Sequence, residues 1–117
     1  MKKLVCVLLC LVAFSSYAKN CEQEAENGGM VAMRECIVAE SEKPVTAAYN
    51  SLIKALGDNQ EAINAIKEAQ TDWLKFRDST CYYISVTDNL DEAANCKADF
   101  NKARAKILTG YTKAAKK

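Results

Sequence analysis

Of the six cysteines in this chain, Cys6 and Cys10 lie in a predicted leader, and the other four place the strongest constraint on the fold: Cys21, Cys36, Cys81 and Cys96. They are at least 15 residues apart and the chain has no histidine, so the close pairs typical of structural zinc sites are absent. An even number of cysteines in a short exported chain is typical of a disulfide framework. The sequence therefore predicts two disulfides, although four cysteines allow three pairings.

Export is itself predicted from the N-terminus. After a positively charged start, residues 4–14 form an unbroken apolar run, shorter than the roughly 20 residues that span a bilayer. Ser16 and Ala18 then fit a signal-peptidase site. We predict a signal peptide over residues 1–18 and a single domain over residues 19–117, with no membrane span after cleavage. An uncleaved membrane anchor is the alternative, which the small residues at the end of the run disfavour.

Apolar residues recur at helical spacing along three stretches, residues 30–56, 60–86 and 90–111. The polar residues 19–29 are expected to form an irregular arm, because they end in an Asn-Gly-Gly turn signal. Pro44 either kinks the first helix or separates two helices. The sequence predicts an all-α fold: a small antiparallel bundle of three helices, or of four if Pro44 breaks the first, with two disulfides.

The expected turns place the cysteines relative to one another. If the first turn is centred between residues 58 and 59, Cys36 and Cys81 lie at the same level of the bundle. If the second is centred between residues 88 and 89, Cys81 and Cys96 also lie level. This geometry does not choose between the pairings.

The residue types present leave little room for catalysis. Without histidine the chain lacks the usual general base and the serine and cysteine triads. Neither a phosphate-binding G-x-x-x-x-G-K-[ST] loop nor a G-x-G-x-x-G motif occurs. Pairs of acids such as Glu40 and Glu42 are ordinary on helix surfaces. We therefore predict no enzymatic activity, no metal and no cofactor.

Charge is unevenly distributed along the chain. Loss of Lys2 and Lys3 with the leader turns the formal net charge of +1 into −1, which argues against a general nucleic-acid binder. Residues 19–43 carry six acids and three bases, whereas residues 97–117 carry seven bases and one acid. The basic end is either a solvated helix face or a surface for an anionic partner.

Residues 69–81, with the sequence AQTDWLKFRDSTC, form the segment richest in aromatic and polar side chains. Trp73 and Phe76 are expected to fill the core, and Arg77 to hydrogen-bond a helix end or a carboxylate. The segment resembles the pattern A-Q-x-x-W-x-x-[FY]-R-[DN]-x-x-C of the LprI-type lysozyme-inhibitor-like family of exported bacterial proteins.

The resemblance continues on both sides of this segment. Upstream, a Met-x-x-C element matches residues 33–36, and a stretch similar to A-D-x-x-L-N-x-x-Y aligns with residues 41–49. Downstream, C-x₇-R-x₃-L matches Cys96, Arg104 and Leu108. The chain departs from the family pattern inside residues 41–49, at Glu42, Pro44 and Thr46.

The resemblance implies a helical, disulfide-bonded domain that is periplasmic or secreted. Some members have a short spacing between their last two cysteines, which supports local pairing, and we expect Cys21–Cys36 and Cys81–Cys96. Five side chains are expected to organise the core or its hydrogen bonds: Gln70, Trp73, Arg77, Tyr49 and Arg104.

The resemblance also implies inhibition of lysozyme, and we consider two functions. The first is an inhibitor of lysozyme-type muramidases that blocks its target sterically and electrostatically. Because many lysozymes are basic, Glu22, Glu24 and Glu26 are the candidate contacts. The alternative is a structural or interaction module without inhibitory activity, which binds another envelope component through residues 97–117.

Overall fold

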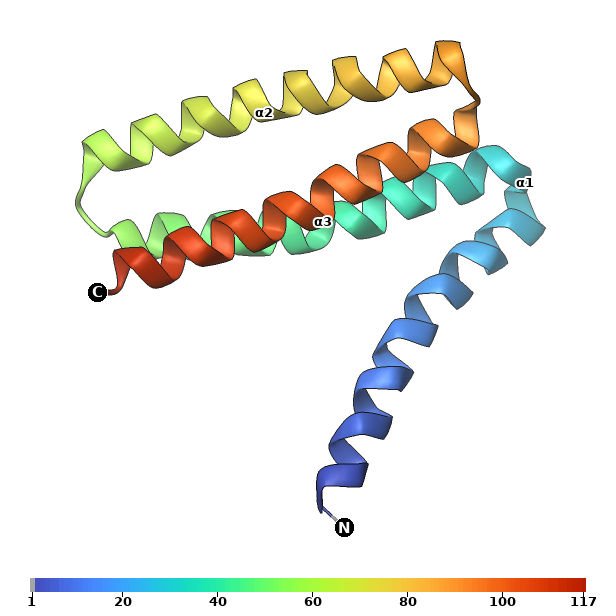
Figure 1. The fold of residues 1–117 in the computed structure, drawn as a ribbon, viewed down its shortest axis with the longest axis horizontal. Coiled ribbons are helices and arrows are strands. Elements are labelled where there is room, and N and C mark those ends of the chain that lie inside the picture. The colour runs from blue at the N-terminus through green and yellow to red at the C-terminus, as the bar shows by residue number, and fades with distance from the viewer. Residues whose placement is uncertain (1) are drawn as a thin grey trace. The chain divides into compact units, whose positions relative to one another are not determined.

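The computed structural model has three α-helices and two disulfides (Figure 1). The helices are α1 (Lys2–Leu56), α2 (Gln60–Thr87) and α3 (Leu90–Ala115). The structure describes the backbone of residues 2–117 and the side chains of residues 21–117, and there is no strand in this range. The side chains of residues 1–18, on which the predicted signal peptide depends, lie outside the described part of the structure. Among the described residues, no helix combines the length and apolar character needed to cross a membrane.

The chain forms two compact units, residues 1–40 and residues 41–117. In the first unit α1 reverses direction at Gly29, whose φ of 76° and ψ of −164° lie outside the helical region. Only glycine adopts such angles without a steric penalty. The preceding Gly28 is needed for space, because a Cβ atom there would lie 2.7 Å from the Cβ atom of Ala32.

The first disulfide joins the two arms on either side of this bend. Cys21 and Cys36 have Cα atoms 5.4 Å apart. Fifteen residues of straight α-helix would separate them by about 22 Å, so the bond requires the reversal at Gly29. The expectation of an irregular arm over residues 19–29 was wrong. Glutamate and glutamine propagate a helix well, and the two glycines bend it instead of marking its start.

Pro44 lies inside α1, and the helix continues through it. The alternative of a fourth helix that starts at Pro44 is therefore not what the structure has. Proline costs the helix one backbone hydrogen bond, but its fixed φ is compatible with helical geometry. Val45, the next residue, is buried against α3, and this packing holds the helix together at that point.

The second unit is a three-helix bundle, in which α2 and α3 run antiparallel side by side (Figure 1). The last four turns of α1 complete it, and Val45 and Leu52 pack against Leu108 of α3. Partly buried side chains surround this core: Ala48, Tyr49, Leu56, Ile66, Trp73 and Ala105. Apolar contact between all three helices therefore fixes the bundle.

Both turns lie where the sequence predicts them. Gly57, with φ of 57°, ends α1 as a left-handed cap. Asn59 caps α2 by accepting a hydrogen bond of 3.1 Å from the amide of Ala62. Asn89 caps α3 in the same way, at 2.8 Å from the amide of Glu92. A side-chain cap of this kind is worth about 1 kcal/mol.

The buried stripe of α2 follows the expected one in the first half of the helix and departs from it at Phe76. Phe76, predicted to fill the core, is 61% exposed, and its ring packs edge-on against Phe100 at 5.7 Å between centroids. Ile63 is buried, and Ile66 and Trp73 pack against the core, but further along the helix Arg77 and Cys81 are the buried residues. A helix in a three-helix bundle buries only a narrow stripe. A small rotation about the helix axis therefore decides whether Phe76 or the next residue, Arg77, is covered.

Candidate functional site

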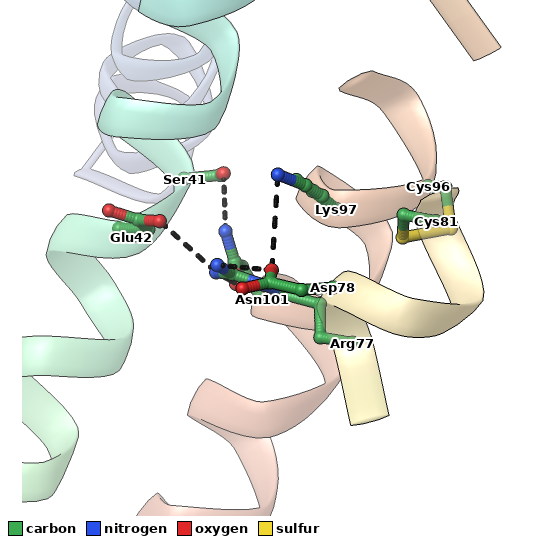
Figure 2. Close-up of polar contacts among 8 residues, drawn as sticks. All are labelled: Ser41, Glu42, Arg77, Asp78, Cys81, Cys96, Lys97 and Asn101. Atoms are coloured by element: carbon green, nitrogen blue, oxygen red, sulfur yellow. Dashed lines mark hydrogen bonds and ion pairs between the residues drawn. A yellow bond between two sulfur atoms is a disulfide. The ribbon is translucent and has the colours of Figure 1, made fainter. Parts of the chain in front are cut away.

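Four residues at positions of the family motif meet two further side chains in a polar cluster inside the second unit (Figure 2). We call it the Arg77 cluster, and its members are Ser41, Glu42, Arg77, Asp78, Lys97 and Asn101. All three helices contribute to it. Its arrangement decides whether these motif residues form a binding site or a structural one.

Arg77 lies at the centre of the cluster and is only 5% exposed. Its Nη1 donates to Oε1 of Glu42 at 3.1 Å and to Oδ1 of Asn101 at 2.9 Å. Its Nε donates to Oδ1 of Asp78 at 2.9 Å, and Nη2 lies 2.8 Å from the same oxygen. The guanidinium is thus paired with two carboxylates, as a buried charge requires.

Asn101 is fully buried and connects the three helices. Its Oδ1 accepts from Arg77 of α2, and its Nδ2 donates to Oγ of Ser41 in α1 at 2.8 Å. The two ends of one amide thereby fix the positions of α1 and α2 against α3. Figure 2 shows these contacts converging on Asn101.

The second disulfide lies beside the cluster (Figure 2). Cys81 and Cys96 have Cα atoms 5.6 Å apart, close to the usual spacing for a disulfide. Asp78 lies one helical turn before Cys81, and Lys97 follows Cys96 directly. Nζ of Lys97 is 3.9 Å from Oδ1 of Asp78, so an ion pair spans α2 and α3 next to the covalent link.

A second arginine also lies over the ring of the motif tryptophan. The guanidinium carbons of Arg77 and Arg104 each lie 5.5 Å from the ring centroid of Trp73. The Nε of Arg104 donates to Oε1 of Gln70 at 3.0 Å. The expected organisers of α2 and α3 are thus connected by contacts, and Tyr49 packs against the apolar core.

The guanidinium of Arg104 makes fewer hydrogen bonds than that of Arg77. Arg104 is 8% exposed, and its buried Nη2 has no hydrogen-bond partner among the described residues. Burial lowers the pKa of the Arg104 guanidinium, and the nearby Tyr111 opposes this change by favouring the charge. The folded state therefore disfavours the charge on Arg104.

The chemistry available to the Arg77 cluster is structural. Its arginine is occupied by bonds to protein side chains, and the cluster contains neither a histidine nor a thiol. No group of three or more potential metal ligands occurs among the described residues. The cluster holds three helices in register, and any contact with a partner must come from exposed side chains.

The candidate contacts Glu22, Glu24 and Glu26 are exposed on α1, in the first unit. Positions four apart share one face of a helix, so Glu22 and Glu26 lie together whereas Glu24 points away from them. The structure thus splits this acidic row between two faces.

Sequence reasoning missed Asn101, Asp78 and Lys97 as members of the cluster. Asn101 could have been predicted as a buried residue, because it lies seven residues before Leu108 on the inward stripe of α3. A polar side chain at such a position requires a buried partner. Ser41 and Glu42 were identified only as aligned motif positions, not as hydrogen-bond partners.

A comparison with family models finds a match over residues 21–108, to a family described as lysozyme inhibitor LprI. The match confirms the resemblance predicted from the motifs, and it spans both disulfides and the Arg77 cluster. No curated protein matches the chain significantly, and no solved structure does.

Proposed function

Because the chain belongs to the LprI family of lysozyme inhibitors, we propose that it is an exported binding protein that inhibits lysozyme-type muramidases. The family match over residues 21–108 carries the proposal. The predicted signal peptide over residues 1–18 supports export, after which the mature domain acts in the periplasm or outside the cell.

Inhibition proceeds by blocking the enzyme and involves no chemistry by the inhibitor. The Arg77 cluster acts as the scaffold, since its donors and acceptors are engaged between the helices. Exposed side chains on this scaffold contact the enzyme. The exposure of Glu22, Glu24 and Glu26 supports them as contacts, because negative charge attracts a basic lysozyme.

The test is a titration of lysozyme activity with the mature, oxidised protein. Animal-type and goose-type enzymes are assayed at low and at moderate salt. We expect stoichiometric inhibition that weakens with salt, because charge steers the association. No inhibition at a large molar excess would reject the proposal.

A matched pair of variants locates the contribution of the acidic row. Replacing Glu22, Glu24 and Glu26 with Gln is expected to weaken inhibition at low salt. The control replaces three exposed acids of α2, Glu61→Gln, Glu68→Gln and Asp72→Asn, so that both variants lose the same charge. Equal inhibition by both variants would exclude the acidic row as a specific contact.

A second candidate function rests on the basic end of α3. Five lysines there are exposed: Lys102, Lys106, Lys113, Lys116 and Lys117. They favour an interaction module that binds an anionic envelope component through residues 97–117. Deletion of residues 113–117 should then abolish capture of the partner in a pull-down while leaving helicity intact. Retained capture would reject this candidate.

A further inference from the structure

Several large apolar side chains at the end of the α2–α3 hairpin are exposed and are not part of the core. We call residues 78–96 the hairpin tip. Four large apolar side chains in it are between 58% and 69% exposed: Tyr82, Tyr83, Val86 and Leu90. Exposed apolar side chains that lie together are typical of interaction surfaces.

Three of these side chains form one continuous surface on α2. Val86 lies four residues after Tyr82 and three after Tyr83, so the three are neighbours on the helix. They face away from the buried Arg77 and Cys81. Tyrosine is enriched in protein interfaces, because its ring buries a large apolar area while its hydroxyl remains hydrogen-bonded.

The same tip is uniformly acidic. Residues 78–96 contain four acids and no base. Asp78 pairs with Arg77 and Lys97, and Asp88, Asp91 and Glu92 are exposed around the turn. The tip therefore combines an apolar surface with negative charge at its edge, which is complementary to a basic protein.

The tip is also held rigid before it meets a partner. The Cys81–Cys96 disulfide ties its two helices together, and the Asn89 cap orders the turn between them. A surface that is already ordered loses less conformational entropy on binding. The split acidic row of Glu22, Glu24 and Glu26 has neither the apolar component nor a single face.

We propose that the hairpin tip docks on the basic surface of the target lysozyme, with Tyr82, Tyr83 and Val86 as the central contacts and Asp88, Asp91 and Glu92 as the steering charges. This inference rests on the proposed function, since it names the surface through which the inhibitor acts. The apolar contacts govern how slowly the complex dissociates, and the acids govern how fast it forms.

The experiment measures association and dissociation rates of the mature, oxidised protein with a basic animal-type lysozyme. The apolar variant carries Tyr82→Ala, Tyr83→Ala and Val86→Ala. Its matched control carries Ile107→Ala and Tyr111→Ala, which remove exposed apolar side chains of α3 outside the tip. The charge variant carries Asp88→Asn, Asp91→Asn and Glu92→Gln, and circular dichroism verifies that each variant is folded.

We expect the apolar variant to dissociate at least tenfold faster, and the control to behave as the wild type does. The charge variant should associate several-fold more slowly, with a weaker dependence on salt. Unchanged rates in both tip variants, with a wild-type protein that binds, would overturn the docking surface and leave the proposed function intact. A wild-type protein that does not bind lysozyme at low salt would overturn both.

Discussion

The Nη1 atom of Arg77 lies 2.9 Å from Oδ1 of Asn101, and both side chains are almost completely buried between α2 and α3. Because the same amide also reaches Ser41 of α1, this bond is the point at which all three helices are joined. The family motif is thus explained by the architecture: its arginine is needed where the helices meet.

Replacing Asn101 with Ala should destabilise the bundle by about 2 kcal/mol, because Arg77 and Ser41 each lose a buried partner. The measurement is urea unfolding followed by the fluorescence of Trp73, which is the only tryptophan and packs on Arg77. Asn64→Ala, at an exposed position of α2, is the control and should change stability by less than about 0.5 kcal/mol. Equal stabilities of the two variants would contradict the joining role of Asn101.

The two arginines that lie over the ring of Trp73 should respond differently to replacement by Met. Arg77→Met leaves the buried amide of Asn101 without its donor and removes the bonds to Glu42 and Asp78. We therefore expect the free energy of unfolding to fall by about 3 kcal/mol. Arg104→Met should cost clearly less. Burial lowers the pKa of Arg104, so its charge opposes folding at every pH below that pKa, and its removal recovers part of the lost contacts. The reverse order in urea unfolding would show that Arg104 is the better satisfied of the two.

Much of the helical organisation could be predicted from the sequence, because turn residues and helical periodicity are local signals. Gly57 and Asn59 end one helix and start the next as expected. The glycines at 28 and 29 were recognised as a break, but a bend between two helical arms and a helix start share the same local sequence. Only the disulfide between Cys21 and Cys36 distinguishes them.

The side that each helix buries is determined by tertiary packing, and here the prediction failed. On α2, the spacing of apolar residues favours a stripe that includes Ile66, Trp73 and Phe76, and the structure follows it as far as Trp73. After Trp73 the structure buries Arg77 and exposes Phe76, because the guanidinium reaches the carboxylate of Glu42 and the amide of Asn101 across the bundle. Such partners lie 24 and 35 residues away in the sequence, so no local pattern identifies them.

This difference leads to a test on two core candidates. Leu108→Ala removes a side chain with no exposed surface, and we expect a loss of about 3 kcal/mol. Phe76→Ala should cost about 1 kcal/mol, since the ring is mostly exposed and loses mainly its edge contact with Phe100. Thermal unfolding of both variants provides the comparison. A larger loss of stability for Phe76→Ala than for Leu108→Ala would show that Phe76 belongs to the core, as hydrophobicity predicts.

Removal of the second disulfide by Cys81→Ala and Cys96→Ala should destabilise the bundle by about 3 kcal/mol, the entropy recovered by a loop of about 15 residues in the unfolded chain. Urea unfolding of the double variant, compared with the oxidised wild type, measures it. Wild-type protein treated with a reductant should approach the stability of the variant. A variant as stable as the oxidised wild type would show that the loop closure contributes nothing to folding.

Two glycines with open space around them should respond in opposite directions to the same substitution. Gly29→Ala places a Cβ atom on a residue with φ of 76°, which costs about 1–2 kcal/mol although no atom blocks it. Because the bend at Gly29 brings Cys21 and Cys36 together, this cost should lower the equilibrium constant for forming that disulfide by about tenfold. The fraction of the Cys21–Cys36 disulfide in a glutathione buffer measures it. Gly110→Ala is the control: it lies inside α3 with nothing near its Cβ atom, so it should stabilise the bundle by about 0.5–1 kcal/mol and leave disulfide formation unchanged. An unchanged fraction in Gly29→Ala would mean that the reversal of α1 does not depend on the left-handed conformation of residue 29.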